Sequence, residues 1–287
     1  MGIINTESAE ALNLKGLHLF HYAMSNCSEK VRLCLEEKGL EWTSHHVDLT
    51  RNEHFAPEYV AINPKAQVPT LIHDGVVVIE SSDIIDYLDR TFPERPLRPN
   101  VSGDLELMYR WLRLWDDTQI HLKTLSHHHL FGRSRVEHLR PQLESAARIV
   151  KNDDLIIFLR EYVSERGLSE ERVKTATEWI GRVLVQLDAR LKDHGWLSGD
   201  FFSLADIAWC IDIHRFQLMR FPMPHSALLS WYGRIEVRPS FKKMVFDYEA
   251  QVLSQVAAGQ RTGLFWKRSP LCPDAMTKYG VSGSDNT

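Results

Sequence analysis

The chain has 287 residues, of which 44% are hydrophobic and 25% are charged. This balance excludes a disordered chain and allows one large or two ordinary domains. The formal net charge of -4 argues against a general nucleic-acid binder, which needs a basic excess to neutralise phosphates. No apolar run approaches the length of a membrane span, so no membrane association is expected.

Cysteine content and the first residues bear on the compartment. Four cysteines (Cys27, Cys34, Cys210 and Cys272) are too few and too scattered for a disulfide framework or a zinc site. Residues 1–15 carry no basic residue before Lys15 and therefore lack the positive start of a secretory signal. We expect a reduced, cytoplasmic protein without a metal.

The first third of the chain alternates between strand and helix patterns. After a polar, loose lead-in, the patterns predict strands at 17–21, 41–47, 68–72 and 76–79 and helices at 25–38, 53–61 and 81–90. Gly39 is placed to end a helix in the left-handed conformation, and Asp74-Gly75 is a strong hairpin signal. This order predicts a small open α/β sheet with helices on its faces.

A proline-rich stretch at 92–99 interrupts the pattern, since no helix or strand interior tolerates it. Helical periodicity follows at 104–130, 134–166, 169–192, 203–220 and 226–250. Ser203 and Asp206 have the spacing of a capping box. We therefore predict an α/β domain at 16–92, a linker at 93–103, an all-helical domain at 104–255, and flexible extensions at 1–15 and 256–287.

Four motifs occur in order along the chain, namely the segments 25–32 (SNCSEKVR), 63–71 (NPKAQVPTL), 80–81 (ES) and 203–208 (SLADIA). Together they resemble the glutathione transferase superfamily, especially its zeta-like branch and the bacterial tetrachlorohydroquinone reductive dehalogenases. The resemblance implies a thioredoxin-like N-terminal domain, a helical-bundle C-terminal domain, and glutathione as co-substrate.

Ser25 is the first candidate catalytic residue. A transferase must favour the thiolate of glutathione, because the thiolate is the nucleophile. A helix N-terminus offers unpaired N–H groups and a partial positive charge, and Ser25 stands where the predicted helix begins. Ser25 is expected to stabilise the thiolate, with Asn26 and Ser28 as supporting donors.

Cys27 has two interpretations. As a thiol near a helix N-terminus it could form a mixed disulfide with glutathione, which would support reductive dehalogenation or thiol exchange. As a residue on the same helical face as Val31 and Cys34 it could instead be a small buried apolar group. The sequence leaves both open.

The resemblance assigns the remaining contacts to glutathione. It implies a cis peptide bond between Val68 and Pro69, with the Val68 backbone pairing to the tripeptide like an added strand and Gln67 beside it. It places Glu80 at the γ-glutamyl ammonium group and Ser81 at the γ-glutamyl carboxylate. The candidates for the glycine carboxylate are His54, ranked first, Lys65 and Arg51.

The long helical pattern from Asp104 is expected to supply the acceptor pocket between the domains. Trp111 and Trp115, four residues apart, are more typical of core packing than of ligand walls. The run 127–129 consists of histidines that point about 100° apart and so cannot converge on one metal ion. The acidic pair at 116–117 is expected to form ion pairs on the helix surface.

The function expected from these observations is a glutathione S-transferase that uses the glutathione thiolate to attack a small electrophilic, aromatic substrate. The alternatives are a glutathione-dependent reductive dehalogenase, β-etherase or isomerase, or a non-catalytic binding module of the same fold. A homodimer is expected from the family alone. The stretch 130–168 could be a lid, a dimer arm or a pocket wall.

Overall fold

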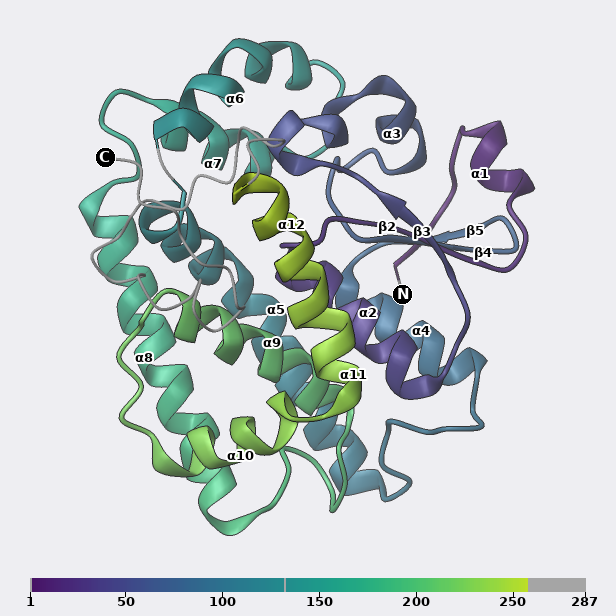
Figure 1. Cartoon of the computed structure of the whole chain (residues 1–287), viewed down its shortest axis with the longest axis vertical. Coiled ribbons are helices and arrows are strands. Elements are labelled where there is room, and N and C mark those ends of the chain that lie inside the picture. Colours follow the sequence, from purple (N-terminus) through teal and green to yellow (C-terminus); the bar gives the residue numbers. More distant parts are fainter. Residues whose placement is uncertain (1, 132, 258–287) are drawn as a thin grey trace.

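The N-terminal part of the chain, which is called the N-terminal half below and ends with residue 91, is built on a mixed sheet. The strand order of this sheet is β1-β5-β4-β2-β3. A computed structural model describes residues 2–131 and 133–257 (Figure 1). Strand β2 is parallel to β3 and antiparallel to β4. The elements of this half are β1 (Ile3–Ile4), α1 (Ala9–Asn13), β2 (Leu17–His21), α2 (Asn26–Lys38), β3 (Thr43–His46), η1 (Leu49–Arg51), η2 (Glu53–Phe55), α3 (Pro57–Ile62), β4 (Thr70–His73), β5 (Val76–Val78) and α4 (Ser81–Thr91).

The alternation of side chains along each strand gives the sheet two apolar faces. Leu19 of β2 is buried on the face covered by α2 and α4, whereas its neighbour Phe20 belongs to the cluster on the face of α3. In β4, Leu71 and Ile72 divide in the same way. Figure 1 shows α3 on one side of the sheet and α2 and α4 on the other, as the predicted α/β arrangement requires.

The predicted turn residues occupy the conformations that their chemistry favours. Gly39 ends α2 with φ +65°, in the left-handed region. Asp74 and Gly75 have φ values of +50° and +84°, so both central residues of the β4–β5 hairpin have positive φ, as a two-residue hairpin of this type needs. Both sequence-based predictions are confirmed.

The first fifteen residues differ from the expected loose extension. Strand β1 pairs with β5 at the sheet edge, and α1 is capped by the Ser8 hydroxyl, which accepts from the Ala11 N–H at 3.2 Å. Ala11 is completely buried against the sheet. A two-residue strand is too short to show an alternating pattern, and β1 is defined only by its pairing with β5.

The C-terminal half is helical throughout its described residues. Its elements are α5 (Ser102–His129), α6 (Arg133–Ala146), α7 (Asp153–Val163), α8 (Glu170–Asp193), α9 (Leu204–Leu218), α10 (Ser226–Glu236), α11 (Pro239–Phe241), the π-helical turn η3 (Lys242–Phe246) and α12 (Asp247–Ala257). The predicted tail at 256–287 lies outside the described residues beyond 257.

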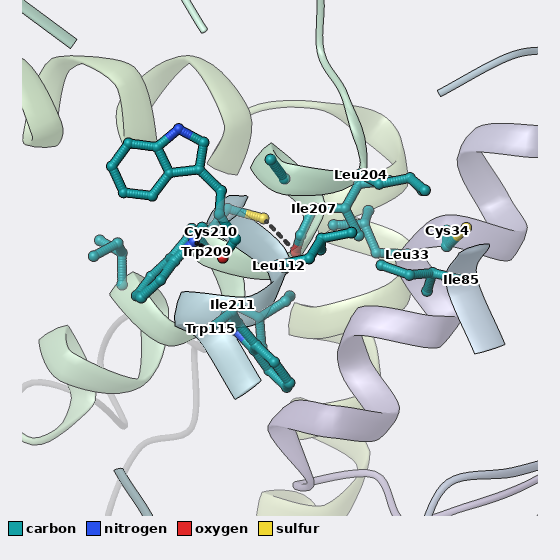
Figure 2. Close-up of a cluster of buried hydrophobic side chains, with 14 of the residues drawn as sticks. Leu33, Cys34, Ile85, Leu112, Trp115, Leu204, Ile207, Trp209, Cys210 and Ile211 are labelled. Atoms are coloured by element: carbon teal, nitrogen blue, oxygen red, sulfur yellow. Dashed lines mark hydrogen bonds between the residues drawn. The ribbon is translucent and has the colours of Figure 1, made fainter. Parts of the chain in front are cut away.

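Helix α9 forms the centre of the main core. Trp209, Cys210 and Ile211 have no exposed surface, and they lie among residues of α2, α4 and α5 (Figure 2). Figure 2 also shows the Cys210 thiol directed at the Ile207 carbonyl, one turn earlier. Cys34 and Cys210 are therefore buried structural residues, as predicted.

The proline-rich connector is anchored rather than loose. The buried Asp89 carboxylate of α4 accepts from the Lys38 ammonium at 2.8 Å, the Leu97 N–H at 2.8 Å and Arg98 Nε at 2.6 Å. The Leu97 carbonyl in turn accepts from the Leu204 N–H at the start of α9. These contacts fix the connector against α2 and α4 on one side and against the start of α9 on the other.

The stretch that the sequence leaves unexplained forms α6 and α7, separated at residues 147–152. Apolar residues of both helices, with Phe158 and Leu159 among them, make a third cluster that includes Phe55 and Ala66 of the N-terminal half. Figure 1 places α6 and α7 beside the α3 region. Within the described part of the chain, no helix combines the length and apolar character of a membrane span.

Candidate functional site

A cavity of about 980 Å³ lies between the two halves. This volume is at the upper end of the range for small-molecule sites. The cavity brings together nearly all of the site residues expected from the sequence, which are Ser25, Asn26, Cys27, His54, Lys65, Gln67, Val68, Pro69, Glu80 and Ser81. Two expected residues, Ser28 and Arg51, are not part of its lining.

Ser25 caps the N-terminus of α2 from an extended backbone conformation. Its hydroxyl oxygen accepts from the Ser28 N–H at 3.4 Å, which leaves the hydroxyl proton free to be donated into the cavity. The helix dipole adds a partial positive charge at the same point. An anionic sulfur placed here would meet both a donor and a favourable field.

The Ser28 side chain stabilises the loop between β2 and α2 and does not line the cavity. It is completely buried, and its hydroxyl oxygen accepts from the Tyr22 N–H at 3.3 Å. This bond holds the turn between β2 and α2. The expected role of Ser28 as a donor to glutathione is therefore replaced by a structural one, because a hydroxyl facing the protein interior cannot reach a ligand.

The position of Cys27 is compatible with both interpretations that the sequence leaves open. It is half-buried, packs against the main core, and lines the cavity. Burial raises the pKa of the Cys27 thiol, although the Lys30 ammonium and a hydrogen bond from Ser81 act in the opposite direction. At neutral pH the thiol is therefore mainly protonated in this state.

The peptide bond between Val68 and Pro69 is cis, as the resemblance implies. In the described residues, no hydrogen bond to the Val68 backbone is found, so its N–H and C=O can pair with a ligand. The preceding residue is fixed by two hydrogen bonds, because the Gln67 carbonyl accepts from the Tyr59 hydroxyl at 2.6 Å and from the Asn63 side chain at 2.9 Å. This edge is a fixed template for an extended peptide.

The N-terminus of α4 forms a second side of the cavity. Glu80 has φ +64°, so the chain turns sharply before Ser81 begins the helix. The Ser81 side chain is buried next to Cys27. The Glu80 carboxylate and the Lys65 ammonium, both about half exposed, form an ion pair at 2.5 Å. Two residues expected at opposite ends of glutathione are thus partners of each other.

His54 is 7% exposed and its Nδ1 atom has no hydrogen-bond partner within the described chain. Burial lowers the pKa of His54 to about 3, with smaller contributions from Arg135 and Lys123, so the ring is neutral at physiological pH. Arg135 of α6 lines the same region and donates to the Asn52 side chain at 2.8 Å. Arg51, by contrast, is exposed outside the lining.

A buried polar bridge joins the two halves below the α2 N-terminus. Asn26 donates to Gln119 of α5 at 2.8 Å and to the Asp212 carboxylate of α9 at 3.2 Å, and Gln119 donates to the same carboxylate at 2.9 Å. Asp212 has no exposed surface. The Asn26 side chain therefore fixes the helix start against the helical half, and its amide hydrogens are already in use.

Replacing Asp212 with asparagine tests this bridge. Burial raises the pKa of Asp212 to about 7, so the folded state holds the proton more tightly than the unfolded chain. Stability linked to this group is present at low pH and is lost as pH rises. Between about pH 5 and about pH 8, wild type should lose roughly 2 kcal/mol of unfolding free energy relative to D212N.

Urea unfolding of both proteins across this range measures the difference. The exposed neighbour Asp117 provides the control, and D117N should follow wild type at every pH. A D212N difference that does not change with pH would contradict the raised pKa.

Comparison with known proteins adds a sequence relationship to this geometry. Residues 19–96 match the glutathione S-transferase N-terminal domain family, and residues 155–239 match the glutathione S-transferase C-terminal domain family. The chain belongs to the glutathione S-transferase superfamily. The thioredoxin-like sheet domain and helical domain expected from the resemblance are those of this fold.

Individual members of the superfamily are similar over most of the chain. The tetrachloro-p-hydroquinone reductive dehalogenase of Sphingobium chlorophenolicum is 28% identical over 240 residues, which cover 78% of this chain and 93% of that protein. The maleylacetoacetate isomerase of Pseudomonas aeruginosa is 29% identical over 195 residues, covering 67% and 77% of the two chains. The crystal structure of the β-etherase LigF from Sphingobium sp. strain SYK-6 has a TM-score of 0.71 at 27% identity and covers 79% of this chain and 98% of that one.

Within this glutathione S-transferase fold, several cavity residues have no counterpart among the sequence-based candidates. Gln119, Lys123 and His127 line the cavity at positions four residues apart on α5. Their spacing marks one helix face and was a signal available in the sequence. Arg135 gave no such signal, because only the packing of α6 brings it to the cavity.

The remaining expectations about α5 have mixed outcomes. Trp111 is a core residue as predicted, whereas Trp115 belongs to the same core and also lines the cavity. Asp116 accepts from Ser82 of α4 at 2.6 Å, so it bridges the two halves and does not pair on its own helix surface. The histidines of the 127–129 run differ in their surroundings, since His127 packs among aromatic rings whereas His128 is exposed. The described residues contain no cluster of three or more His, Cys, Asp or Glu side chains suited to a metal ion.

Proposed function

We propose that this chain is a glutathione-dependent transferase that activates the glutathione thiolate at Ser25 for attack on a small electrophilic aromatic substrate. The observation that carries the proposal is the meeting of three features in one cavity. These are the α2 N-terminus at Ser25, the open backbone of Val68 before a cis proline, and the α4 N-terminus at Ser81.

Each part of the tripeptide has a matching group. The Val68 backbone pairs with the cysteinyl residue, which directs the thiol toward Ser25. The α4 N-terminus and Ser81 receive the γ-glutamyl carboxylate, and Glu80 receives the ammonium group. His54 and Arg135 bind the glycine carboxylate, because a neutral imidazole N–H and a guanidinium both donate to an anion. Lys65 balances the charge of Glu80.

In the conjugation step, the glutathione thiolate attacks an aromatic carbon that bears a leaving group. A carbon–sulfur bond forms, the leaving group departs with the bonding electrons, and the thiol proton passes to solvent. Ser25 stabilises the thiolate before attack, and the cavity holds the acceptor next to the sulfur. As expected from the family, the proposal includes a homodimer in the cytoplasm and no metal.

Two measurements test the proposal. Titration calorimetry should detect glutathione binding, and a chlorodinitrobenzene assay should detect glutathione-dependent release of chloride. Binding without turnover would favour a non-catalytic binding module of the same fold. Absence of binding would contradict the proposal.

Reductive dehalogenation is the second candidate, favoured by the position of Cys27 in the cavity two residues after Ser25. A glutathionyl arene would be attacked at its sulfur by the Cys27 thiolate. The arene carbon takes a proton, a Cys27–glutathione disulfide forms, and a second glutathione releases Cys27 as glutathione disulfide. The balance is one aryl chloride and two glutathiones giving the reduced arene, glutathione disulfide and hydrogen chloride.

The variant C27S separates the two candidates. Because burial raises the pKa of Cys27, we expect conjugation to need no Cys27 thiolate and kcat/KM to stay within about threefold of wild type. Reductive dehalogenation of a chlorohydroquinone should fall at least about 100-fold, since the disulfide cannot form. C34S is the matched control, as Cys34 is buried outside the cavity. If C27S lost conjugation activity while C34S kept it, the conclusion that conjugation does not need Cys27 would be contradicted.

A further inference from the structure

The aromatic end of the cavity is formed by α5, the segment that follows it, and α7. The His127 ring lies edge to face with Phe131 at 4.8 Å and with Phe158 at 5.0 Å between ring centroids. His127 Nδ1 and the Lys123 carbonyl are 2.8 Å apart, which fixes the ring. Burial lowers the pKa of His127 to about 3, so this ring is an uncharged wall at neutral pH. The surface is suited to a flat aromatic ring.

Lys123 lies one helical turn before His127 and is the unusual member of this end. Its side chain is half-buried in the cavity lining, and its ammonium lies 5.4 Å from the centre of the Phe158 ring. Within the described residues the ammonium has no hydrogen bond and no ion pair. The nearby Arg172 differs, because its guanidinium is paired with Glu161 at 2.7 Å.

Several acidic groups influence this ammonium from a distance. Burial lowers the pKa of Lys123, while Cys27, Asp154 and Glu80 raise it. Asp154 is exposed, and Glu80 is already paired with Lys65. Lys123 and Cys27 line the same cavity, in which a sulfur nucleophile would react. A half-buried cation without a partner is costly unless an anion joins it.

We infer that Lys123 selects acceptors that are anionic aromatics, with a carboxylate or phenolate group on the ring held at the ammonium while the ring lies against His127, Phe131 and Phe158. The inference rests on the proposed function, because the acceptor must meet a glutathione sulfur. The two carboxylates of glutathione are assigned to other groups of the cavity, one to Ser81 and one to His54 with Arg135, so the acceptor is the anion left for Lys123.

A matched pair of acceptors tests the inference. A chloronitrobenzoate with the carboxylate para to chlorine is compared with its methyl ester, and each kcat/KM is divided by the rate constant of the uncatalysed reaction with glutathione. This division removes the lower intrinsic reactivity of the carboxylate. Wild type should favour the carboxylate by at least about tenfold.

In K123Q, the value for the carboxylate should fall at least about tenfold and that for the ester less than about twofold, while K123R retains most of the preference. K174Q removes an exposed lysine outside the cavity and should behave as wild type. Competitive inhibition by nitrobenzoate compared with nitrobenzamide should show the same contrast without any chemical step. Unchanged glutathione binding by calorimetry shows that the variants are folded.

Three results would overturn the inference. An equal loss of kcat/KM in K123Q with the carboxylate and the ester would indicate that Lys123 stabilises the glutathione sulfur anion and does not bind the acceptor. Equal use of carboxylate and ester by wild type would remove the selectivity while leaving the transferase function intact. Failure of wild type to bind glutathione or to convert the ester would instead contradict the proposed function itself, and the inference with it.

Discussion

Replacing Ser25 with alanine should lower kcat/KM for glutathione conjugation about 100- to 1,000-fold, the loss usual for one donor to a reacting anion. This corresponds to about 3–4 kcal/mol of transition-state stabilisation. The physical reason is that the Ser25 hydroxyl is the side-chain donor at the α2 N-terminus that can face the sulfur, since the Asn26 amide is bound to Gln119 and Asp212. Stopped-flow or steady-state assays at saturating acceptor measure the effect.

The S25A substitution also removes a helix cap, so a control is needed that measures the loss of a serine cap alone. Ser169 caps α8 in the same way, accepting from the Arg172 N–H at 3.4 Å, but lies outside the cavity. S169A should therefore lose about 1 kcal/mol of stability or less and keep full activity. S25T should recover much of the rate because it keeps the hydroxyl. Full activity in S25A would contradict the role assigned to Ser25.

The largest effect on stability is expected at Asp206. This completely buried carboxylate accepts from the Leu197 N–H at 3.0 Å, the Ser203 N–H at 2.9 Å, the Ser203 hydroxyl at 2.8 Å and Trp231 Nε1 at 2.9 Å. D206A would leave these donors buried without partners. The free energy of unfolding should fall by roughly 3–5 kcal/mol.

Urea unfolding, followed by tryptophan fluorescence and circular dichroism together, measures this loss. D200A removes an exposed carboxylate from the same segment and should change stability by less than about 0.5 kcal/mol. D206N keeps one acceptor oxygen and should lie between wild type and D206A. A loss below about 1 kcal/mol in D206A would show that neighbouring groups or water replace the carboxylate.

Local chemistry made much of the fold predictable. The left-handed glycine at 39, the Asp74-Gly75 hairpin and the Asp206 side chain bonded to the Ser203 N–H each depend on neighbours in the sequence. The motifs around Ser25, Val68 and Ser81 could be placed together because a resemblance supplied the long-range arrangement that spacing alone does not. These residues all line the cavity.

The residues that escaped prediction depend on contacts between distant segments. Asp212 meets Asn26 across 186 positions, and Arg135 reaches Asn52 across 83. Lys123 resembles any solvated lysine until α7 brings Phe158 to its ammonium. Strand β1 escaped for the same reason, since its two residues gain their structure only by pairing with β5.

The most direct test of the role of Ser25 is the pKa of the glutathione thiol in the complex. It is measured as the pH dependence of the thiolate ultraviolet absorbance, taken as the difference between complexed and free protein in the C27S background. If Ser25 stabilises the thiolate, this pKa is below about 7.5 with Ser25 present and returns toward the free value of about 8.5 in S25A. A bound thiol that titrates like free glutathione with Ser25 in place would contradict it.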